Sequence, residues 1–407
     1  MPFVAYLRVV LVLGGLGWLP ASAQEAAKPV RLGFLTDMSG PGAIDDGPGG
    51  VAAARMAIAD FGGTVLGRPI ELLVGDHQNK ADTGLSLAKK WYDQDGVDAI
   101  LDANNSAVAL AVQQLTRDKD RVFLITGGSS SLLTGSACSP NGIQWQSDTY
   151  SLGRAVALSV LQDGGKSWYF LTVDTALGQA LEHDATDVLK SNGGSVAGGS
   201  KHPFGASDFA ALLLEAQSSG AKVLGLANTA GDMQNAVKQA HEFGLDRQMR
   251  VVPLFMLIMD VNGIGLAQMA GARFAEVFYW DTDDATRTWS RRFFATEKHM
   301  PTSIQVDAYR ATTHYLKAVQ AVGTTDAAAV IAHMKQTPIQ DALGFGGTIR
   351  VDGRVLRDMH YVEVKSPADS KYDWDYYRII RDLPADQVYR PLDKSDCGFV
   401  KALGRPK

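Results

Sequence analysis

Cysteine, a residue typical of metal and redox sites, is scarce in this 407-residue sequence. It has two cysteines, Cys138 and Cys397, and neither has a second cysteine or a histidine at metal-ligand spacing. We therefore expect no metal and no cofactor. In an oxidising compartment the two cysteines could form one disulfide, which would tie the C-terminal tail to the first half of the chain. The histidines show no pair four residues apart, and each is expected to be an ordinary surface or core residue (His77, His183, His202, His241, His299, His314, His333 and His360).

Long apolar runs and basic blocks are also missing. Beyond the N-terminus the longest apolar candidate, residues 251–259, is interrupted by Pro253. It falls well short of the ~20 residues that span a bilayer. The net charge is −5, and Lys and Arg form no cluster. These features argue against a membrane-spanning protein and against a nucleic-acid partner.

The common signatures of nucleotide-binding and hydrolytic enzymes are absent as well. The chain has no G-x-x-x-x-G-K-[ST] phosphate loop, no G-x-G-x-x-G after Leu35, no G-x-S-x-G and no H-E-x-x-H. Asp45-Asp46 is a pair of adjacent acids, but adjacent carboxylates in a loop are expected to be solvated. The sequence thus predicts a protein that is not an enzyme. An exported enzyme that lacks these signatures is the alternative.

The N-terminal segment has the three parts of a secretory signal. Arg8 supplies positive charge, residues 9–19 form a short apolar core, and Ala21-Ser22-Ala23 has the small residues that signal peptidase reads. We expect residues 1–23 to be a signal peptide that is cleaved near Ala23. A membrane anchor is the alternative, but the apolar core is too short to cross a bilayer. No cysteine stands near the cleavage site, so lipid attachment is not expected.

Apolar runs typical of buried strands alternate with amphipathic, helix-like stretches along the rest of the chain. One series extends from the strand at 30–35 to the strand at 122–125, and the rhythm restarts after Tyr150. Such alternation indicates βαβ units and parallel sheets. We expect an α/β protein of two doubly wound parallel-sheet lobes joined by crossover strands. The N-terminal lobe would hold residues 24–143 and about 282–345, and the C-terminal lobe with the tail would hold 144–281 and about 346–407.

Small polar residues are concentrated in two N-lobe loops that follow strands. Asn104-Asn105-Ser106 directly precedes a helix, and residues 126–131 read Thr-Gly-Gly-Ser-Ser-Ser. Ligands of open α/β sheets bind at the carboxyl ends of the strands, where helix N-termini present free N–H groups. Ser and Asn at a helix start can also cap the helix without any ligand. Two such loops in one lobe favour a binding site for a carboxylate.

The order of several short motifs resembles that of the type I periplasmic binding proteins of the Leu/Ile/Val-binding class. No single motif is decisive, but their order and spacing cover nearly the whole chain after the signal segment. The motifs are the strand and Ser-Gly-Pro loop at 30–41, then 66–72, Asp76 with 79–82, 168–178 and 301–309. The resemblance implies a periplasmic monomer that closes on a small molecule like a venus flytrap and delivers it to an inner-membrane ABC permease.

The resemblance also implies which residues bind the ligand. N-lobe loops hold its carboxylate in the family, at positions that match Asn105, Ser106, Gly128, Ser129 and Ser130. In the second lobe, an aromatic residue usually precedes the glycine that matches Gly178, and this chain has Leu177 there. A further contact comes from the loop that matches Thr229. Where the family often has an acid for the ligand's amine, this chain has Leu254-Phe255-Met256.

That departure bears on the chemical class of the ligand. A buried ammonium without a carboxylate partner is costly, so an apolar wall at Phe255 fits an aromatic or apolar carboxylate without an amine. The sequence is similar to the aromatic-acid-binding branch of the family in its Gly-Pro-Gly-Gly run and in residues 148–150, which adds Tyr150 to the candidate site. An amino acid is the alternative, with its amine meeting Asp232 or Asp45. A carboxylate that faced the Phe255 wall would argue against the aromatic acid.

The expected function is therefore that of a solute-binding component of an ABC importer. A module of the same fold that senses a ligand for a membrane receptor is the rival within the binding class. A structural or adhesion protein is a further rival, which ligand-dependent closure would exclude.

Overall fold

The N-terminal half of the chain is built on a six-stranded sheet. The computed structural model describes residues 1–5, 28–344 and 346–403. The strand order is β2-β3-β1-β4-β5-β6, and every pairing is parallel except the short β2–β3 hairpin. The strands are β1 (Val30–Thr36), β2 (Thr64–Val65), β3 (Arg68–Asp76), β4 (Ala99–Asp102), β5 (Val122–Ile125) and β6 (Gly142–Gln144).

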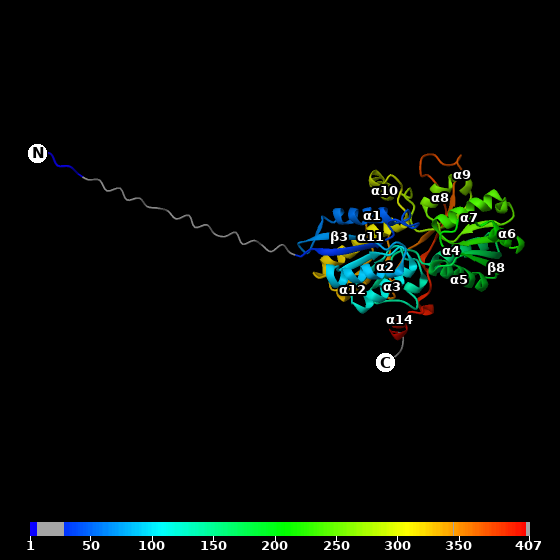
Figure 1. Ribbon diagram of the computed structural model, residues 1–407, viewed down its shortest axis with the longest axis horizontal. Coiled ribbons are helices and arrows are strands. Elements are labelled where there is room, and N and C mark those ends of the chain that lie inside the picture. The colour runs from blue at the N-terminus through cyan, green and yellow to red at the C-terminus, as the bar shows by residue number, and fades with distance from the viewer. Residues whose placement is uncertain (6–27, 345, 404–407) are drawn as a thin grey trace.

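Helices cover both faces of this sheet because its central strands are apolar on both faces. Leu32 and Phe34 of β1 belong to the core cluster that includes α1, whereas Leu35 belongs to the cluster that includes α2 and α3. The helices of this half are α1 (Gly47–Asp60), α2 (Ala81–Lys90) with a π-helical turn at Trp91–Asp95, and α3 (Ser106–Asp118). Three helices from late in the sequence join them, α10 (Asp284–Glu297), α11 (Ser303–Val322) and α12 (Ala327–Gln336), and Figure 1 shows α11 beside α1.

A second parallel sheet, in the order β10-β9-β7-β8, forms the centre of the other half (Figure 1). Its strands are β7 (Ser167–Val173), β8 (Ser195–His202), β9 (Val223–Ala227) and β10 (Arg250–Pro253). Its helices are α4 (Thr149–Gln162), α5 (Ala176–Ser191), α6 (Ala210–Ser218), α7 (Ala230–Glu242), α8 (Ile258–Ile264) and α9 (Leu266–Met269). The predicted α/β class with two parallel-sheet cores is confirmed. In the following text the two halves are called the N-lobe and the C-lobe.

The C-lobe also contains an antiparallel sheet that the alternation of strands and helices did not predict. It has the order β11-β14-β15, formed by Arg273–Glu276, Met359–Val364 and Tyr377–Leu383. A small hairpin of β12 (Thr348–Ile349) and β13 (Val355–Leu356), which contacts α12 of the N-terminal half, precedes β14, and α13 (Ala385–Val388) and α14 (Gly398–Leu403) follow β15. Single 3₁₀ turns lie at Ser131–Leu133, Leu245–Arg247 and Leu392–Lys394.

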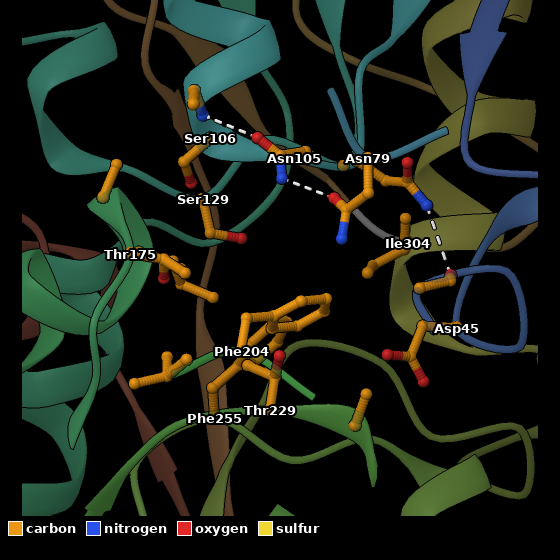
Figure 2. Close-up of a pocket in the computed structure, with 18 residues that line it drawn as sticks. Asp45, Asn79, Asn105, Ser106, Ser129, Thr175, Phe204, Thr229, Phe255 and Ile304 are labelled. Atoms are coloured by element: carbon orange, nitrogen blue, oxygen red, sulfur yellow. Dashed lines mark hydrogen bonds between the residues drawn. The ribbon is translucent and has the colours of Figure 1, made fainter. Parts of the chain in front are cut away.

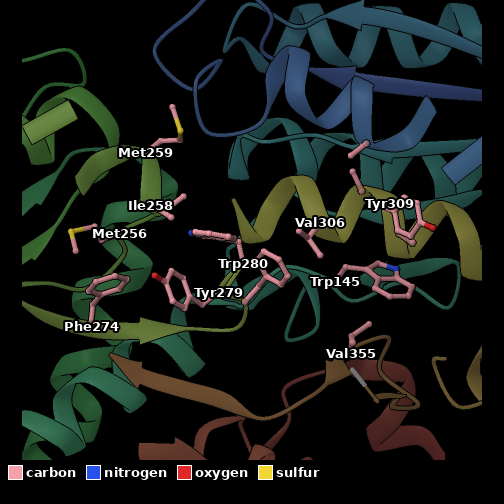
Figure 3. Packing of buried hydrophobic residues seen from close by; sticks show 14 of the residues in the cluster. Trp145, Met256, Ile258, Met259, Phe274, Tyr279, Trp280, Val306, Tyr309 and Val355 are labelled. Atoms are coloured by element: carbon pink, nitrogen blue, oxygen red, sulfur yellow. The ribbon is translucent and has the colours of Figure 1, made fainter. Parts of the chain in front are cut away.

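Three segments cross between the lobes and share one hydrophobic core. They follow β6, follow β11 and precede β14, and we call them together the hinge. Figure 3 shows Tyr279 and Trp280 between Phe274 on the C-lobe side and Val306 on the N-lobe side. Trp145 belongs to the same buried cluster. The apolar core therefore runs through the hinge instead of ending at each lobe.

Buried charges fix the hinge segments to one another. Arg357 pairs with Asp307 of α11 through both of its terminal nitrogens, and its Nη2 also donates to the carbonyl of Trp145 at 3.2 Å. Arg354 donates to the same carbonyl at 2.9 Å and lies 3.7 Å from Asp148. The hinge segments after β6 and before β14 are thus tied to each other and to α11 by buried charged groups.

A disulfide joins Cys138 of the N-lobe to Cys397 of the C-terminal tail, with 5.5 Å between their Cα atoms. The tail follows α13, which packs on α4 of the C-lobe, so this bond adds a covalent link between the lobes. Among the described residues no helix is both long and apolar enough to cross a membrane. The predicted cleavage site near Ala23 and most of the predicted signal peptide lie outside the described residues.

Glu276, at the end of β11, makes a pH-dependent contribution to stability. Complete burial raises its pKa from 4.5 to about 7, against the lowering effect of a hydrogen bond from the Val277 N–H. The folded protein then holds a proton that the unfolded chain releases at lower pH. Stability therefore falls as the pH rises from about 4.5 through about 7, by up to roughly 3 kcal/mol.

Replacing Glu276 with Gln removes this loss, because the amide stays neutral at every pH. Urea unfolding at several pH values between 5 and 8 should show a flatter pH dependence for Glu276→Gln than for the native protein. Glu71→Gln is the matched control, because Glu71 is half exposed in a surface ion pair with Arg31. Parallel pH profiles for Glu276→Gln and the native protein would contradict the prediction.

Candidate functional site

One cavity of about 370 Å³ lies between the lobes, at the carboxyl ends of both parallel sheets. This volume is in the range of small-molecule sites. Figure 2 shows the labelled N-lobe side chains Asn79, Asn105 and Ser106 on one side, and those of Phe204, Thr229 and Phe255 on the other. The lining residues are Gly42, Asp45, Asn79, Asn104, Asn105, Ser106, Ala107, Gly127, Ser129, Val173, Thr175, Ala176, Leu177, Phe204, Thr229, Ala230, Phe255 and Ile304.

The N-lobe side of the cavity comes from the loops after β4 and β5. Asn105 is the N-cap of α3, and its side-chain oxygen accepts hydrogen bonds from the N–H groups of Ala107 and Val108 at 2.8 and 3.1 Å. Its amide also donates to Asn79 at 2.5 Å. The Asn105 side chain, which the sequence predicted to bind a carboxylate, therefore caps the start of α3. Asn105 still lines the cavity.

The backbone at the end of β4 is bent to bring these loops together. Asp102 and Ala103 have φ angles of 83° and 62°, a left-handed conformation that is unfavourable for residues with a side chain. Gly127 of the next loop packs so closely that a Cβ there would lie 2.6 Å from the Cα of Asn104. Only glycine fits at 127, and the two polar loops consequently meet at one edge of the cavity.

Ser129 presents a free hydroxyl at this edge. The side chain is only 2% exposed, and its Oγ has no hydrogen-bond partner among the described residues. The Ser129 carbonyl accepts from the Thr149 N–H at 2.7 Å, which fixes the loop to the start of α4. A buried hydroxyl without a partner is costly, so a ligand atom that accepts its proton would be favoured.

The C-lobe side of the cavity comes from the starts of α5 and α7. Thr175 is the N-cap of α5 and accepts from the Gly178 N–H at 3.3 Å. Thr229 is the N-cap of α7 but makes no side-chain capping bond. Gly178 allows α5 to begin this close to the sheet, because a Cβ there would lie 2.1 Å from the Val173 carbonyl oxygen.

Three helix N-termini therefore converge on one cavity, those of α3, α5 and α7. Each helix N-terminus carries a partial positive charge and unpaired N–H groups, and is suited to bind an anion. Leu177 and Phe255 add apolar surface. The arrangement can hold a carboxylate against the helix starts and an apolar body against the C-lobe side.

Three residues that the sequence offered for the site lie outside the lining. Gly128 accepts a hydrogen bond from Gln144 through its carbonyl, and Ser130 caps the following 3₁₀ turn by accepting from the Leu132 N–H. The guanidinium group of Arg390 lies over the Tyr150 ring, with its Cζ atom 4.4 Å from the ring centre. Gly128 and Ser130 are sequence neighbours of the lining residues Gly127 and Ser129, but consecutive side chains of a loop point in different directions. Tyr150 was proposed from the resemblance alone.

The expectation that Asp45 and Asp46 are solvated is wrong. Both are buried, and Asp45 lines the cavity while Asp46 points beneath it towards Asp102. Burial, with the negative charge of Asp260, raises the pKa of Asp45 well above its usual range. Burial and then Asp102 do the same for Asp46. The acid that the sequence proposed as the other amine partner, Asp232, instead accepts hydrogen bonds from the Gly205 N–H at 3.0 and 3.1 Å.

Several lining residues were not singled out by the sequence. Thr175 could have been found as a Thr that precedes a predicted helix. Phe204 gave no local signal, because its loop is held by the distant Asp232. Ile304 lies at the start of α11, a helix from late in the sequence that joins the N-lobe and looked like an ordinary helix.

Comparison with known proteins places the chain in a family. The model of a periplasmic binding protein family matches residues 29–371. A periplasmic binding protein from Burkholderia mallei is 44% identical, with a TM-score of 0.90 over 91% of this chain and 99% of that one. A branched-chain amino acid ABC transporter periplasmic ligand-binding protein from Burkholderia xenovorans is 39% identical, with a TM-score of 0.83 over 91% and 100%.

A more distant structure has the same fold. A solute-binding protein of an ABC transporter from Rhodopseudomonas palustris, in complex with 3,4-dihydroxybenzoic acid, is 20% identical, with a TM-score of 0.80 over 90% of this chain and 99% of that one. No curated protein sequence matches the chain. The chain belongs to the type I periplasmic binding proteins of the branched-chain amino acid transporter family, a family of transporter substrate-binding proteins whose location is the periplasm.

Proposed function

We propose that the protein is the substrate-binding component of an ABC importer, and that it captures a small solute with a carboxylate group. The observation that carries the proposal is the convergence of three helix N-termini and the free Ser129 hydroxyl on one interlobe cavity. Among the described residues that line the cavity there is no Lys, Arg or His, so the helix starts and hydroxyl groups supply the favourable interactions for an anion. The ABC-transporter relative from Burkholderia xenovorans supports the transport role.

In this proposal the lobes follow the sequence-based division, with residues 24–143 and about 282–345 in one lobe and 144–281 and about 346–407 in the other. The protein is exported, its signal peptide is cleaved near Ala23, and it acts as a monomer. Contacts from both lobes to one ligand favour the closed form over the open form. An inner-membrane permease then recognises the closed form, and a separate ATPase supplies the energy for transport.

A thermal-shift screen of the protein without residues 1–23 tests this function. One panel holds amino acids, including Leu, Ile and Val, and the other holds aromatic and short aliphatic carboxylates without an amine. A ligand that binds the native state raises the melting temperature by mass action. We expect carboxylates to raise it, and their amides or methyl esters to have little effect. Shifts by esters that equal those of the acids would contradict the carboxylate site.

Ser129→Ala should weaken the binding of any solute found in this screen by about tenfold, because one hydrogen bond to a charged group is lost. Isothermal titration calorimetry measures the change. Ser130→Ala is the matched control, since its hydroxyl caps a 3₁₀ turn away from the cavity. That variant should lose some stability and keep its affinity. Equal effects of the two substitutions on affinity would argue against a role for Ser129.

A further inference from the structure

Three consecutive serines lie in the N-lobe loop after β5, and their hydroxyl groups have three different environments. The Ser130 hydroxyl caps the following 3₁₀ turn by accepting from a backbone N–H at 3.3 Å. The Ser131 hydroxyl donates to Asp184 of α5 at 2.7 Å. Only the Ser129 hydroxyl has no partner among the described residues, and Ser129 is the one serine of the three that lines the cavity. We call residues 129–131 the serine loop.

Asp184 is a buried acid that faces the serine loop from the C-lobe, and it is 2% exposed. Its Oδ2 accepts hydrogen bonds from two hydroxyl groups, those of Ser131 at 2.7 Å and Thr149 at 2.6 Å. Its Oδ1 accepts from the guanidinium group of Arg390 at 3.1 Å. One carboxylate thus satisfies three hydrogen-bond donors, which come from the serine loop, the start of α4 and the C-terminal tail.

Thr149, the first residue of α4, attaches the serine loop to the same network. Its N–H donates to the Ser129 carbonyl at 2.7 Å, and its hydroxyl oxygen accepts from the Ser131 N–H at 3.1 Å. The Thr149 hydroxyl in turn donates to Asp184. Hydrogen bonds to an ionised acceptor are stronger than those between neutral groups, so the carboxylate is the strongest acceptor in this network.

The helix that carries Asp184 also forms part of the cavity. Thr175, Ala176 and Leu177 at the start of α5 line it, and Asp184 lies about two turns further along the same helix. α5 also contacts α3 of the N-lobe. Figure 2 shows Ser129 on the same side of the cavity as Thr175. Because Asp184 binds the serine loop to α5, it fixes the Ser129 hydroxyl relative to the α5 N-terminus.

We propose that Asp184 is a positioning residue of the binding site. It is not among the described residues that line the cavity, but it holds the serine loop of the N-lobe against α5 of the C-lobe and so directs the Ser129 hydroxyl towards the solute. The inference rests on the proposed function. Both hydroxyl groups bind the same oxygen, Oδ2, so the role needs an acceptor at that place and does not need the negative charge. Asparagine keeps such an acceptor, and alanine removes it.

Hydrogen exchange of the solute-free protein tests the position of the loop. In Asp184→Ala the N–H groups of residues 129–133 should exchange about tenfold faster than in the native protein, because the loop opens more easily without its acceptor. In Asp184→Asn the exchange should stay within a few-fold of native. Asp187→Ala is the matched control, because Asp187 lies on the same helix with its side chain 62% exposed. Its loop should exchange like that of the native protein.

Isothermal titration calorimetry with leucine and with benzoate measures the effect on binding. For a probe that binds, Asp184→Ala should weaken binding by about tenfold, the effect expected for loss of the Ser129 hydrogen bond itself. Asp184→Asn should recover most of this affinity. In a Ser129→Ala background, Asp184→Ala should weaken binding by less than about twofold, because the effects of two residues that act through one interaction do not add.

The other outcomes separate this proposal from the proposed function. Unchanged exchange of residues 129–133 in Asp184→Ala overturns the role of Asp184, whether or not a probe binds. The role is also overturned if Asp184→Ala weakens binding equally with and without the Ser129 hydroxyl, or if Asp184→Asn weakens it as much as Asp184→Ala. If the loop exchanges as expected and neither leucine nor benzoate binds, the positioning of the loop by Asp184 stands, and the result counts against the proposed function alone.

Discussion

Replacement of Asp307 with Leu is expected to lower the free energy of unfolding by about 3–5 kcal/mol, among the largest effects of any single substitution in this chain. Asp307 and Arg357 are 1% and 4% exposed at their side chains. Removal of the acid leaves the Arg357 guanidinium buried with only the Trp145 carbonyl as a described hydrogen-bond acceptor. Because the pair joins α11 to the segment before β14, we expect its removal to destabilise the hinge.

Urea unfolding of Asp307→Leu, Arg357→Met and the double variant measures the effect. The double variant should recover much of the loss, since apolar side chains of similar volume often replace a buried ion pair without a net cost. Asp93→Leu is the control, because Asp93 pairs with Lys119 at the surface with both side chains more than a third exposed. It should change stability by about 1 kcal/mol or less. If Asp307→Leu had no more effect than Asp93→Leu, the hinge pair would contribute little.

The loss of the disulfide is the second large effect. Cys138 and Cys397 are separated by 259 positions in the sequence, and closure of so long a loop removes much of the conformational freedom of the unfolded chain. Replacing both cysteines with Ser should lower the free energy of unfolding by up to about 5 kcal/mol. Urea unfolding in the absence of reductant shows the difference directly.

The reduced native protein is the control for this prediction. Its urea midpoint should approach that of the double Ser variant, because neither has the bond. Solute affinity should change little, since neither cysteine lines the cavity. Equal midpoints for the oxidised native protein and the Ser variant would show that the bond does not constrain the unfolded chain. A large loss of affinity would indicate that the tail also holds the lobes in their binding geometry.

Local patterns were enough to predict the two parallel sheets but not the antiparallel one. β1, β4 and β5 are apolar runs with helices between them. Such runs can be recognised as strands from the local sequence alone. β15 has mostly exposed residues and carries no such pattern, and β11 pairs with a strand more than 80 residues later. Pairing at that distance is decided by the folded core, which a local window does not contain.

The candidate site shows the same division. Asn105, Ser106 and Ser129 could be proposed because small polar residues in loops that follow strands mark the ligand edge of a parallel sheet. Thr229 could be proposed from the family resemblance. The burial of Asp45 could not, because two adjacent acids in a glycine-rich loop look solvated until α11 is placed over them through Thr302. Phe204 depends in the same way on a hydrogen bond from Gly205 to Asp232, made across 27 positions.

The meeting of three helix N-termini has a consequence for the choice of buffer. Helix N-termini bind small inorganic anions such as sulfate or phosphate as well as carboxylates, so under the proposed function these ions compete with the solute. An ion with millimolar affinity that is present at ~50 mM reduces the apparent affinity of a competing solute by roughly 50-fold through mass action. Dissociation constants for this protein are therefore comparable only when they are measured in the same buffer ion, and chemically inert cationic buffers with a weakly binding counter-ion give the value closest to the intrinsic one.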